Sequence, residues 1–150
     1  MINNLSPEEI EKILSRNYIA HLACVDENST PYLVPITFYY QAEENAFVCY
    51  TSEGKKIEIL RKNPKVSVLV SEVEDLSHWR SVSIAGTFEE LTGAEAFEGI
   101  KILSTRLTKL INDQSNQNVK FINDMARVNE NNAKVIYRIH VHSKVGRCED

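Results

Sequence analysis

A succession of strand-like segments, joined by turns of only a few residues, constrains this chain more than any other feature of its sequence. Polar residues at positions 26–29 and 43–45 separate neighbouring apolar segments. Connections this short suit antiparallel neighbours, and small sheets remove their exposed edges by closing into barrels. We therefore predict a mainly β protein, an antiparallel barrel with peripheral helices. About six strands are expected, at residues 18–25, 31–40, 46–50, 66–73, 81–91 and 134–145.

Three or four helices are predicted around this barrel. The Ser6–Glu9 segment reads as a capping box with proline at the first helical position, so one helix begins there. Apolar residues at spacings of three and four predict a short helix that ends at Asn63 and a long one after Gly93. A polar break at residues 112–118 precedes a further short helix, predicted at residues 119–128.

Composition and charge restrict the function. A chain of 150 residues with 43% hydrophobic and 25% charged residues is typical of one soluble domain, and we predict a single domain over residues 1–150. The net charge of −4 argues against general nucleic-acid binding. Apolar runs are too short to span a bilayer, so no membrane association is expected. The acidic N-terminal segment lacks the features of a signal peptide, which predicts a cytoplasmic protein.

The cysteines and the last-strand histidines carry little chemical signal. Cys24 and Cys49 lie in apolar strands and are interpreted as small buried side chains. Together with Cys148 they make an odd number without a CxxC pair, so we expect no disulfide within the chain. His140 and His142 alternate along a strand and share one face, but the spacing supplies no third ligand. No metal site is predicted.

A basic junction between a strand and a helix is the first candidate binding site. Thr51 and Ser52 end a strand, Gly54 opens a turn, and Lys55 and Lys56 begin the following short helix. Hydroxyls, free backbone N–H groups at a helix N-terminus and ammonium groups are the donors that a phosphate needs. Lysines in a first helical turn also oppose the helix dipole, which points to a reason outside the helix. The alternative is a pair of solvated surface lysines.

Three sequence blocks, taken in order, resemble the FMN-binding split β-barrel family. They are PYLVPITFYY, VCYTSEGKKIEILRKNPKVSVLV and WRSVSIAGTFEEL. The similarity runs from about Leu5 to Gly146 and is to the group around pyridoxamine 5'-phosphate oxidase, nearest the nitroimidazole-resistance-like and general-stress-like branches. The resemblance implies a split antiparallel β-barrel homodimer. It also implies two symmetric FMN sites at the subunit interface, each touching both chains.

The resemblance can be carried over to individual positions. It implies that the first block lies along the isoalloxazine ring, that the end of the next strand reaches the ring and the ribityl or phosphate part, that the two lysines hold the phosphate, and that the third block reaches the interface. The matching residues are Val34, Pro35, Ile36, Thr37, Tyr50, Thr51, Ser52, Lys55, Lys56, Trp79, Ser81 and Val82. Proline cannot donate to a ladder, so Pro35 itself marks an edge, a bulge or a break.

Two departures from the family pattern limit what the resemblance implies. The nitroimidazole-resistance-like branch often carries histidine where this chain has Tyr50, so chemistry that needs that histidine is not expected. The chain ends HVHSKVGRCED and lacks the C-terminal tryptophan and arginine motif of true pyridoxamine 5'-phosphate oxidases. Oxidation of vitamin B6 is therefore not predicted. Gly146 and Arg147 match a terminal Gly-basic pair whose role the sequence does not define.

The leading hypothesis is an FMN-dependent oxidoreductase that passes electrons from NAD(P)H or another donor to a small acceptor, with no catalytic side chain identified. A second hypothesis is a flavin carrier or stress-sensing module without turnover. A third keeps the barrel dimer with heme or a deazaflavin, and heme would need an axial ligand such as Tyr50, His140 or His142. The role of His78, in the polar loop predicted at residues 74–78, stays open.

Overall fold

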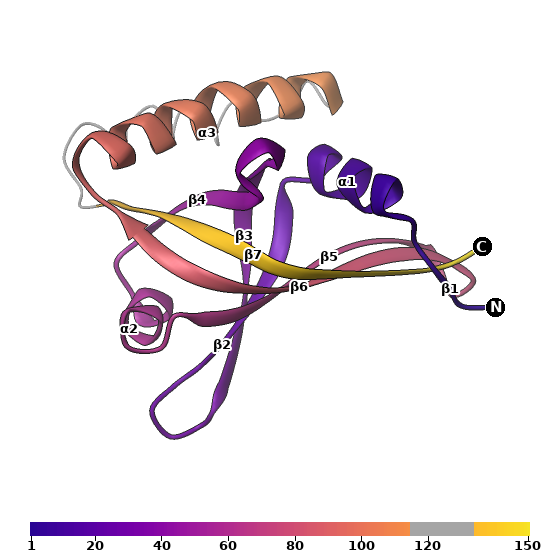
Figure 1. Cartoon of the computed structure of the whole chain (residues 1–150), viewed down its shortest axis with the longest axis horizontal. Helices are drawn as coiled ribbons and strands as arrows, with labels where there is room; N and C mark the ends of the chain where they lie inside the picture. Colours follow the sequence, from indigo (N-terminus) through magenta and orange to yellow (C-terminus); the bar gives the residue numbers. More distant parts are fainter. Residues whose placement is uncertain (115–133) are drawn as a thin grey trace.

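Among the described residues, seven strands form one antiparallel sheet that curls until its two ends meet. The computed structural model describes residues 1–114 and 134–150. The strand order is β1-β7-β4-β3-β2-β5-β6, and a further pairing of β7 with β6 closes the ring (Figure 1). The strands are β1 (Asn3–Asn4), β2 (Ile19–Val25), β3 (Pro31–Gln41), β4 (Ala46–Ser52), β5 (Lys65–Asp75), β6 (His78–Leu91) and β7 (Lys134–Glu149). The predicted barrel is confirmed.

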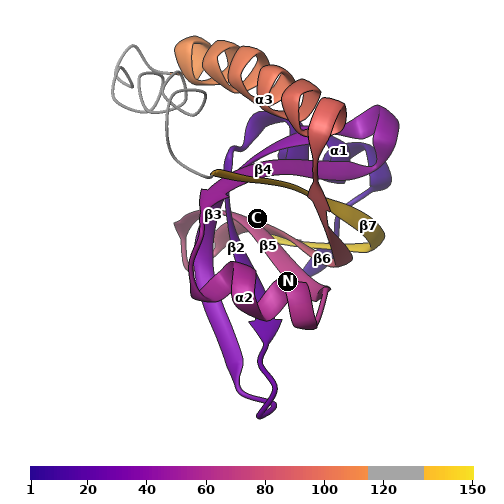
Figure 2. The ribbon, with the colours of Figure 1, turned by 90° about the vertical axis from the view of Figure 1, so that its left-hand side faces the viewer.

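Three α-helices surround the sheet in the described residues, as expected. They are α1 (Pro7–Arg16), α2 (Lys55–Lys62) and α3 (Gly93–Gln114), and a short 3-10 turn, η1 (Ala42–Glu44), precedes β4. Figure 1 shows α1 and α3 on one side of the barrel and α2 at one end of it, and the turned view in Figure 2 shows α3 lying across β4. None of the helices in the described ranges has an apolar stretch long enough to span a membrane.

The boundaries differ from the predictions where long-range pairing extends an element. The polar loop predicted at residues 74–78 shrinks to a turn, because the β5–β6 ladder continues to the pair Asp75 and His78. The short strand β1 was not predicted, and it exists because it pairs with the end of β7. Helix α3 continues to Gln114, into the predicted polar break. The short helix predicted at residues 119–128 lies outside the described residues.

The N-terminal helix begins as the sequence predicts. The Ser6 hydroxyl accepts a hydrogen bond from the backbone N–H of Glu9, and the Glu9 carboxylate accepts one from the backbone N–H of Ser6. Ile10, Ile13 and Leu14 on one face of α1 are buried in the main core of the barrel. This burial, more than the cap, fixes α1 against the sheet, because each buried aliphatic side chain contributes roughly 1.5–3 kcal/mol.

Two hydrophobic cores lie on opposite faces of the same strands. The barrel interior holds Phe38, Phe47 and Tyr137, each fully buried. The second core lies between α3 and the outer face of the sheet, where Leu103 and Leu107 pack with Val48 and their neighbours. Side chains alternate along a strand, so β4 contributes to both cores. Cys24 and Cys49 are buried with free thiols, in agreement with their predicted role as small core side chains.

Pro35 lies on an edge, which decides between the three predicted alternatives. The β2–β3 register runs without a shift from Pro31 to Thr37. On its other side, β3 pairs with β4 only from Phe38 onward. Residues 31–37 therefore form the open edge that splits the barrel, and a missing backbone donor costs little there.

Gly146, whose role the sequence left open, is a packing position. A Cβ atom at Gly146 would lie 2.8 Å from the Leu5 Cβ and 2.8 Å from a side-chain carbon of Ile10. The backbone N–H of Leu5 also donates to the Gly146 carbonyl, at 3.0 Å. The N-terminal segment thus approaches β7 more closely than any side chain would permit.

We predict that Gly146→Ala lowers the free energy of unfolding by roughly 1–3 kcal/mol, because the added methyl group forces this contact apart. Urea unfolding followed by circular dichroism measures the change. Gly54→Ala is the matched control: a Cβ there meets nothing within 4 Å, so the expected loss is below about 1 kcal/mol and comes from alanine at an N-cap, not from a clash. Equal losses in the two variants would contradict the packing argument.

Candidate functional site

The N-terminus of α2 presents unused backbone donors. Gly54 occupies the N-cap position with extended backbone, and no side chain caps the helix. The space around the Gly54 Cα is open to at least 4 Å where a Cβ would point. An uncapped helix start carries free N–H groups and the positive end of the helix dipole. This end of α2 can therefore accept an anionic group.

The two lysines of this site take different environments. The Lys55 side chain is exposed, with its Nζ 4.8 Å from the centroid of the Tyr32 ring. Lys56 is partly buried, and its Nζ lies 5.9 Å from the centroid of the Tyr137 ring inside the barrel. The alternative of two solvated surface lysines therefore does not describe Lys56.

The ammonium group of Lys56 is partly desolvated, which disfavours its positive charge. Burial lowers the pKa of Lys56 below its ordinary value. Among the described residues, no hydrogen bond or ion pair joins its ammonium group to an acceptor. The aromatic contact to Tyr137 is at the outer limit of about 6 Å for cation–π attraction. It therefore offsets little of the free-energy cost of burying the ammonium charge. A bound anion would supply the missing partner.

The acidic residue that directly precedes the helix start is paired elsewhere. Glu53 precedes Gly54 but binds Arg61 through two hydrogen bonds of 2.9 and 2.8 Å. Arg61 also binds Glu90, with its Nε 2.7 Å from the carboxylate. The Arg61 guanidinium holds the pKa of Glu53 below its ordinary value. This network keeps the negative charge of Glu53 from neutralising the helix start, a role that the sequence pattern did not reveal.

The end of β4 directs one hydroxyl group toward the barrel interior. Thr51 follows Cys49 by two residues and so shares the inner face of β4. Tyr50 packs on the opposite face, in the core under α3, and Ser52 shares that face. Lys134 pairs with Ser52 in the β4–β7 ladder and its Nζ donates to the Ser52 hydroxyl at 3.2 Å, so Lys134 also lies on the outer face. The structure therefore brings Thr51, but neither Ser52 nor Tyr50, to the inner side of this junction.

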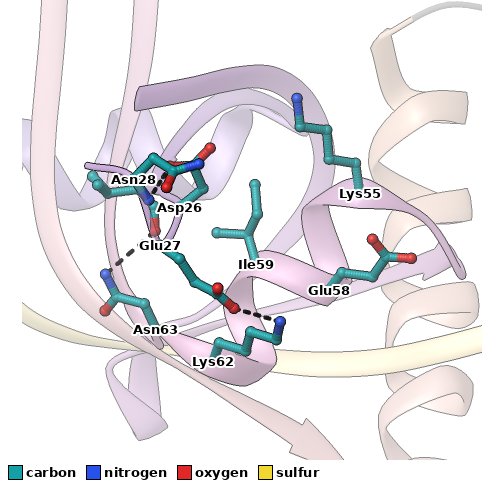
Figure 3. A pocket seen from close by; sticks show the side chains of 9 residues that line it. Asp26, Glu27, Asn28, Lys55, Glu58, Ile59, Lys62 and Asn63 are labelled. Atoms are coloured by element: carbon teal, nitrogen blue, oxygen red, sulfur yellow. Dashed lines mark hydrogen bonds and ion pairs between the residues drawn. The ribbon is translucent and has the colours of Figure 1, made fainter. Parts of the chain in front are cut away.

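A cavity of about 430 Å³ lies beside this junction, between α2 and the turn after β2. Figure 3 shows Lys55 and Lys62 on its walls, with Lys62 directed toward Glu27. Asp26 and Glu58 also line it, so its three carboxylates outnumber its two ammonium groups. Lys56 does not line this cavity. A phosphate is therefore better matched to the helix start near Lys56 than to this mixed-charge cavity.

The first predicted block divides between the two faces of β3. Val34 packs against the main core and Ile36 is buried within it. Pro35 and Thr37 point to the outer face of the sheet, where Pro35 is exposed. A planar ligand along this edge would meet the backbone of residues 34–37 and the side chains of the outward-facing pair. Whether these residues contact a cofactor stays a prediction.

The third predicted block lies at the other end of the barrel. Trp79 is the second residue of β6, beside the β5–β6 turn, and Ser81 follows on the same face. Val82 is fully buried in the main core. Figure 1 shows this turn near the chain termini, with α2 at the opposite end of the long axis. One chain therefore does not bring Trp79 together with Lys56.

Three of the four histidines, His78, His140 and His142, have polar partners. The His140 ring lies 3.0 Å from the Glu89 carboxylate, and the His142 ring contacts the Thr87 hydroxyl. His78 closes the β5–β6 turn through the Asp75 carboxylate, at 2.9 Å. Within the described ranges, no group of three histidine, cysteine or acidic side chains is arranged to hold a metal ion.

Comparison with known proteins places the chain in a family. The family model for pyridoxamine 5'-phosphate oxidase matches residues 6–147. The chain belongs to this family. The pyridoxamine 5'-phosphate oxidase-like relationship expected from the three sequence blocks is confirmed, and it accounts for the split-barrel fold.

Similar proteins include two whose names state a ligand: FAD for one, FAD and heme for the other. A FAD-binding protein from Mesorhizobium loti is 28% identical, with a TM-score of 0.73 over 100% of this chain and 98% of that one. The FAD and heme binding protein from Mycobacterium smegmatis is 16% identical, with a TM-score of 0.71 over 97% and 72% of the two chains, and shows the fold alone. The uncharacterized protein RA0666 of Rhizobium meliloti (strain 1021) is 34% identical over 91 residues. That match covers 61% of this chain and 58% of the relative.

We predict that Lys56→Met stabilises the cofactor-free protein at pH 7, since the variant no longer holds a charge in a desolvated place. The lowered pKa means that the unfolded chain binds more protons just below pH 10.5, the ordinary lysine value, so wild-type stability rises with pH there. The advantage of the variant should therefore shrink as pH approaches that value. Urea unfolding at pH 7 and at about pH 10 measures both effects.

The control for this comparison is Lys12→Met, on the exposed surface of α1. It should change stability by less than about 0.5 kcal/mol at either pH. A Lys56→Met variant less stable than the wild type at pH 7 would mean that the charge is favourably solvated or paired.

Proposed function

We propose that this chain binds FMN at the N-terminus of α2 and acts as an oxidoreductase, passing electrons from NAD(P)H or another donor to a small acceptor. The observation that carries the proposal is Lys56: a partly buried ammonium group without an anionic partner in the described residues, beside an uncapped helix start. A phosphate dianion satisfies both features. Family membership supports a flavin as the molecule that carries this phosphate.

The residues present suit a phosphate-anchored cofactor. The free N–H groups of α2 and the Lys56 ammonium would hold the phosphate, with Lys55 adding positive charge nearby. Thr51 would supply a hydroxyl donor toward the ribityl chain. The edge at residues 34–37 offers backbone groups to the polar rim of a ring. Bound flavin supplies hydride and electron transfer, and the chain binds it, orients it and excludes water.

A second copy of the chain would complete the site. Lys56 and Trp79 lie at opposite ends of the barrel, so a site using both needs two chains. Two adjacent rows of residues cross β3, β2, β5, β6 and β7 on the outside of the sheet and carry neither acidic nor basic groups apart from one histidine. These rows, called the outer face here, are Pro35, His21, Leu69, Ser83 and Val145, then Leu33, Ala23, Ser67, Ala85 and Ser143.

The outer face is suited to a twofold homodimer. Leu33 is 67% exposed, Val145 46% and Leu69 40% in the single chain. Exposed surfaces with several apolar side chains and few charges mark protein interfaces, and a twofold dimer is the commonest closed assembly. Pro35 belongs to this face, so the edge assigned to the flavin ring would border the partner.

The proposed function is tested by the absorbance spectrum of the purified protein and by identification of the released chromophore. FMN released in a ratio of about one per chain supports the proposal, whereas FAD, heme or a deazaflavin as the sole chromophore overturns it. Reduction of the bound flavin by NADH or NADPH, followed by steady turnover with a quinone or nitroaromatic acceptor, supports the oxidoreductase. Bound FMN that no reductant turns over favours the flavin carrier instead.

We predict that Lys56→Ala weakens FMN binding by roughly ten- to a hundredfold, because a partly buried charge-assisted contact contributes about 1.5–3 kcal/mol. Fluorescence quenching of FMN on titration with apoprotein measures the dissociation constant. Riboflavin lacks the phosphate, so wild type and Lys56→Ala should bind it almost equally. Lys56→Arg should lose less affinity than Lys56→Ala, since the charge is kept.

Lys62→Ala is the matched control, because Lys62 lies in the same helix, is exposed and pairs with Glu27. It should bind FMN within about twofold of wild type. If Lys56→Ala keeps wild-type affinity for FMN, or loses riboflavin equally, the phosphate is not held by Lys56.

We predict that Leu69→Glu converts the dimer into a monomer, because it places a desolvated carboxylate at the centre of the outer face. Sedimentation velocity at micromolar concentration distinguishes the two species, and FMN binding should fall with the dimer. Phe97→Glu, at an apolar side chain of α3 that is 65% exposed, is the control and should stay dimeric. A dimeric Leu69→Glu variant, or a monomeric wild type, would exclude this interface.

A further inference from the structure

Arg61 ties the residue before α2 to the last turn of that helix and to the barrel wall. Its guanidinium donates to the Glu53 carboxylate at 2.9 and 2.8 Å. It also donates to the Glu90 carboxylate of β6, at 2.7 and 3.1 Å. The planar fork of a guanidinium fixes the geometry of its carboxylate partners more firmly than a lysine would. The position of the Glu53 carboxylate is thus set by a side chain eight residues further along the chain.

Glu53 stands directly before the helix start where the phosphate site is proposed. Gly54 is the N-cap of α2 and Lys55 its first residue, so Glu53 precedes the helix by two residues. Two Cα–Cα steps span no more than about 7.6 Å, which leaves the first turn within reach of a rotated glutamate side chain. Arg61 instead holds this carboxylate beside the last turn, about 9 Å along the helix axis from Lys55.

A carboxylate and a phosphate compete for the same donors at a helix start. Both are stabilised by free backbone N–H groups and by the positive end of the helix dipole. The Lys56 ammonium has no acceptor among the described residues and attracts either anion. A group tethered by a short stretch of chain also acts at an effective concentration on the order of millimolar. Glu53, once released from Arg61, is therefore a strong internal competitor of a dissolved anion.

We propose that Arg61 is a positioning residue that keeps the anion site at the start of α2 open by holding Glu53 away from it. The inference rests on the proposed function, because it concerns the same phosphate site. It adds a closed state, in which the released Glu53 carboxylate occupies the helix start and contacts Lys56. Glu90 stabilises the open state, because it anchors the guanidinium to β6. The apparent affinity for a phosphate falls in proportion to the fraction of molecules that remain open.

A double-mutant cycle on FMN binding tests the proposal in the full chain. Both side chains are exposed, so Arg61→Met, Glu53→Gln and the double variant should remain folded. Arg61→Met should weaken FMN by roughly three- to tenfold, because most molecules then occupy the closed state. Glu53→Gln should alter FMN affinity less than about twofold, and the double variant should bind FMN within about twofold of wild type. Riboflavin, which lacks the phosphate, should bind all four proteins almost equally.

The cycle separates this mechanism from simpler ones. If Glu53→Gln tightens FMN binding as much in wild type as in Arg61→Met, only net charge matters and the proposal is wrong. If the double variant stays as weak as Arg61→Met, or if riboflavin binding is lost as well, Arg61 merely supports the fold and the proposal is again wrong. Lys62→Ala removes a positive charge from the next residue of α2 and is the control, with FMN affinity expected within about twofold of wild type.

Inorganic phosphate distinguishes a failure of this inference from a failure of the proposed function. Isothermal titration calorimetry with phosphate reports on the anion site without a flavin. Phosphate binding that weakens in Arg61→Met and recovers in the double variant supports the role of Arg61 even where the released chromophore is not FMN. FMN binding that Arg61→Met leaves unchanged overturns the role of Arg61 alone. A wild type that binds neither FMN nor millimolar phosphate overturns both.

Discussion

Closure of the sheet by β7 is the constraint on which the rest of the structure depends. This strand pairs with β4 through its first residues and with β6 over most of its length, although it follows both by dozens of residues. The two ladders satisfy backbone groups that would otherwise form exposed edges. They also create the two faces that organise the molecule: an interior filled by aromatic side chains, and an outer surface on which α3 packs.

The candidate site lies where this closed sheet leaves polar groups incompletely paired. Inside, the start of α2 holds Lys56 at the end of the barrel, where burial disfavours its charge. Outside, Gln41 Oε1 and Arg138 Nε are buried without a hydrogen-bond partner among the described residues. A folded domain is only about 5–15 kcal/mol more stable than its unfolded chain, so such costs are a substantial fraction of the total. Binding sites typically keep groups that lower the stability of the folded protein, because function requires those groups there.

Much of the fold could be predicted from local patterns. The capping box at Ser6, the stop at Asn63 and the apolar period after Gly93 were enough to predict the three described helices. Alternation and turn residues indicated the main strands but not their ends. The strand β1 and the long β5–β6 hairpin depend on partners distant in the chain, whose register no local pattern encodes.

The candidate site shows the same division. The sequence by itself determined that two lysines, two hydroxyls and a glycine meet at a helix start, because these residues are consecutive. Only the tertiary structure decided that Lys56 is partly buried, that Glu53 pairs with Arg61, and that Ser52 pairs with Lys134 on the outer face of the sheet. The tertiary structure also places Tyr50 in the core under α3 and Trp79 at the far end of the barrel. Burial and the distance between remote segments depend on how the whole sheet closes, which is a property of long-range pairing and not of any one segment.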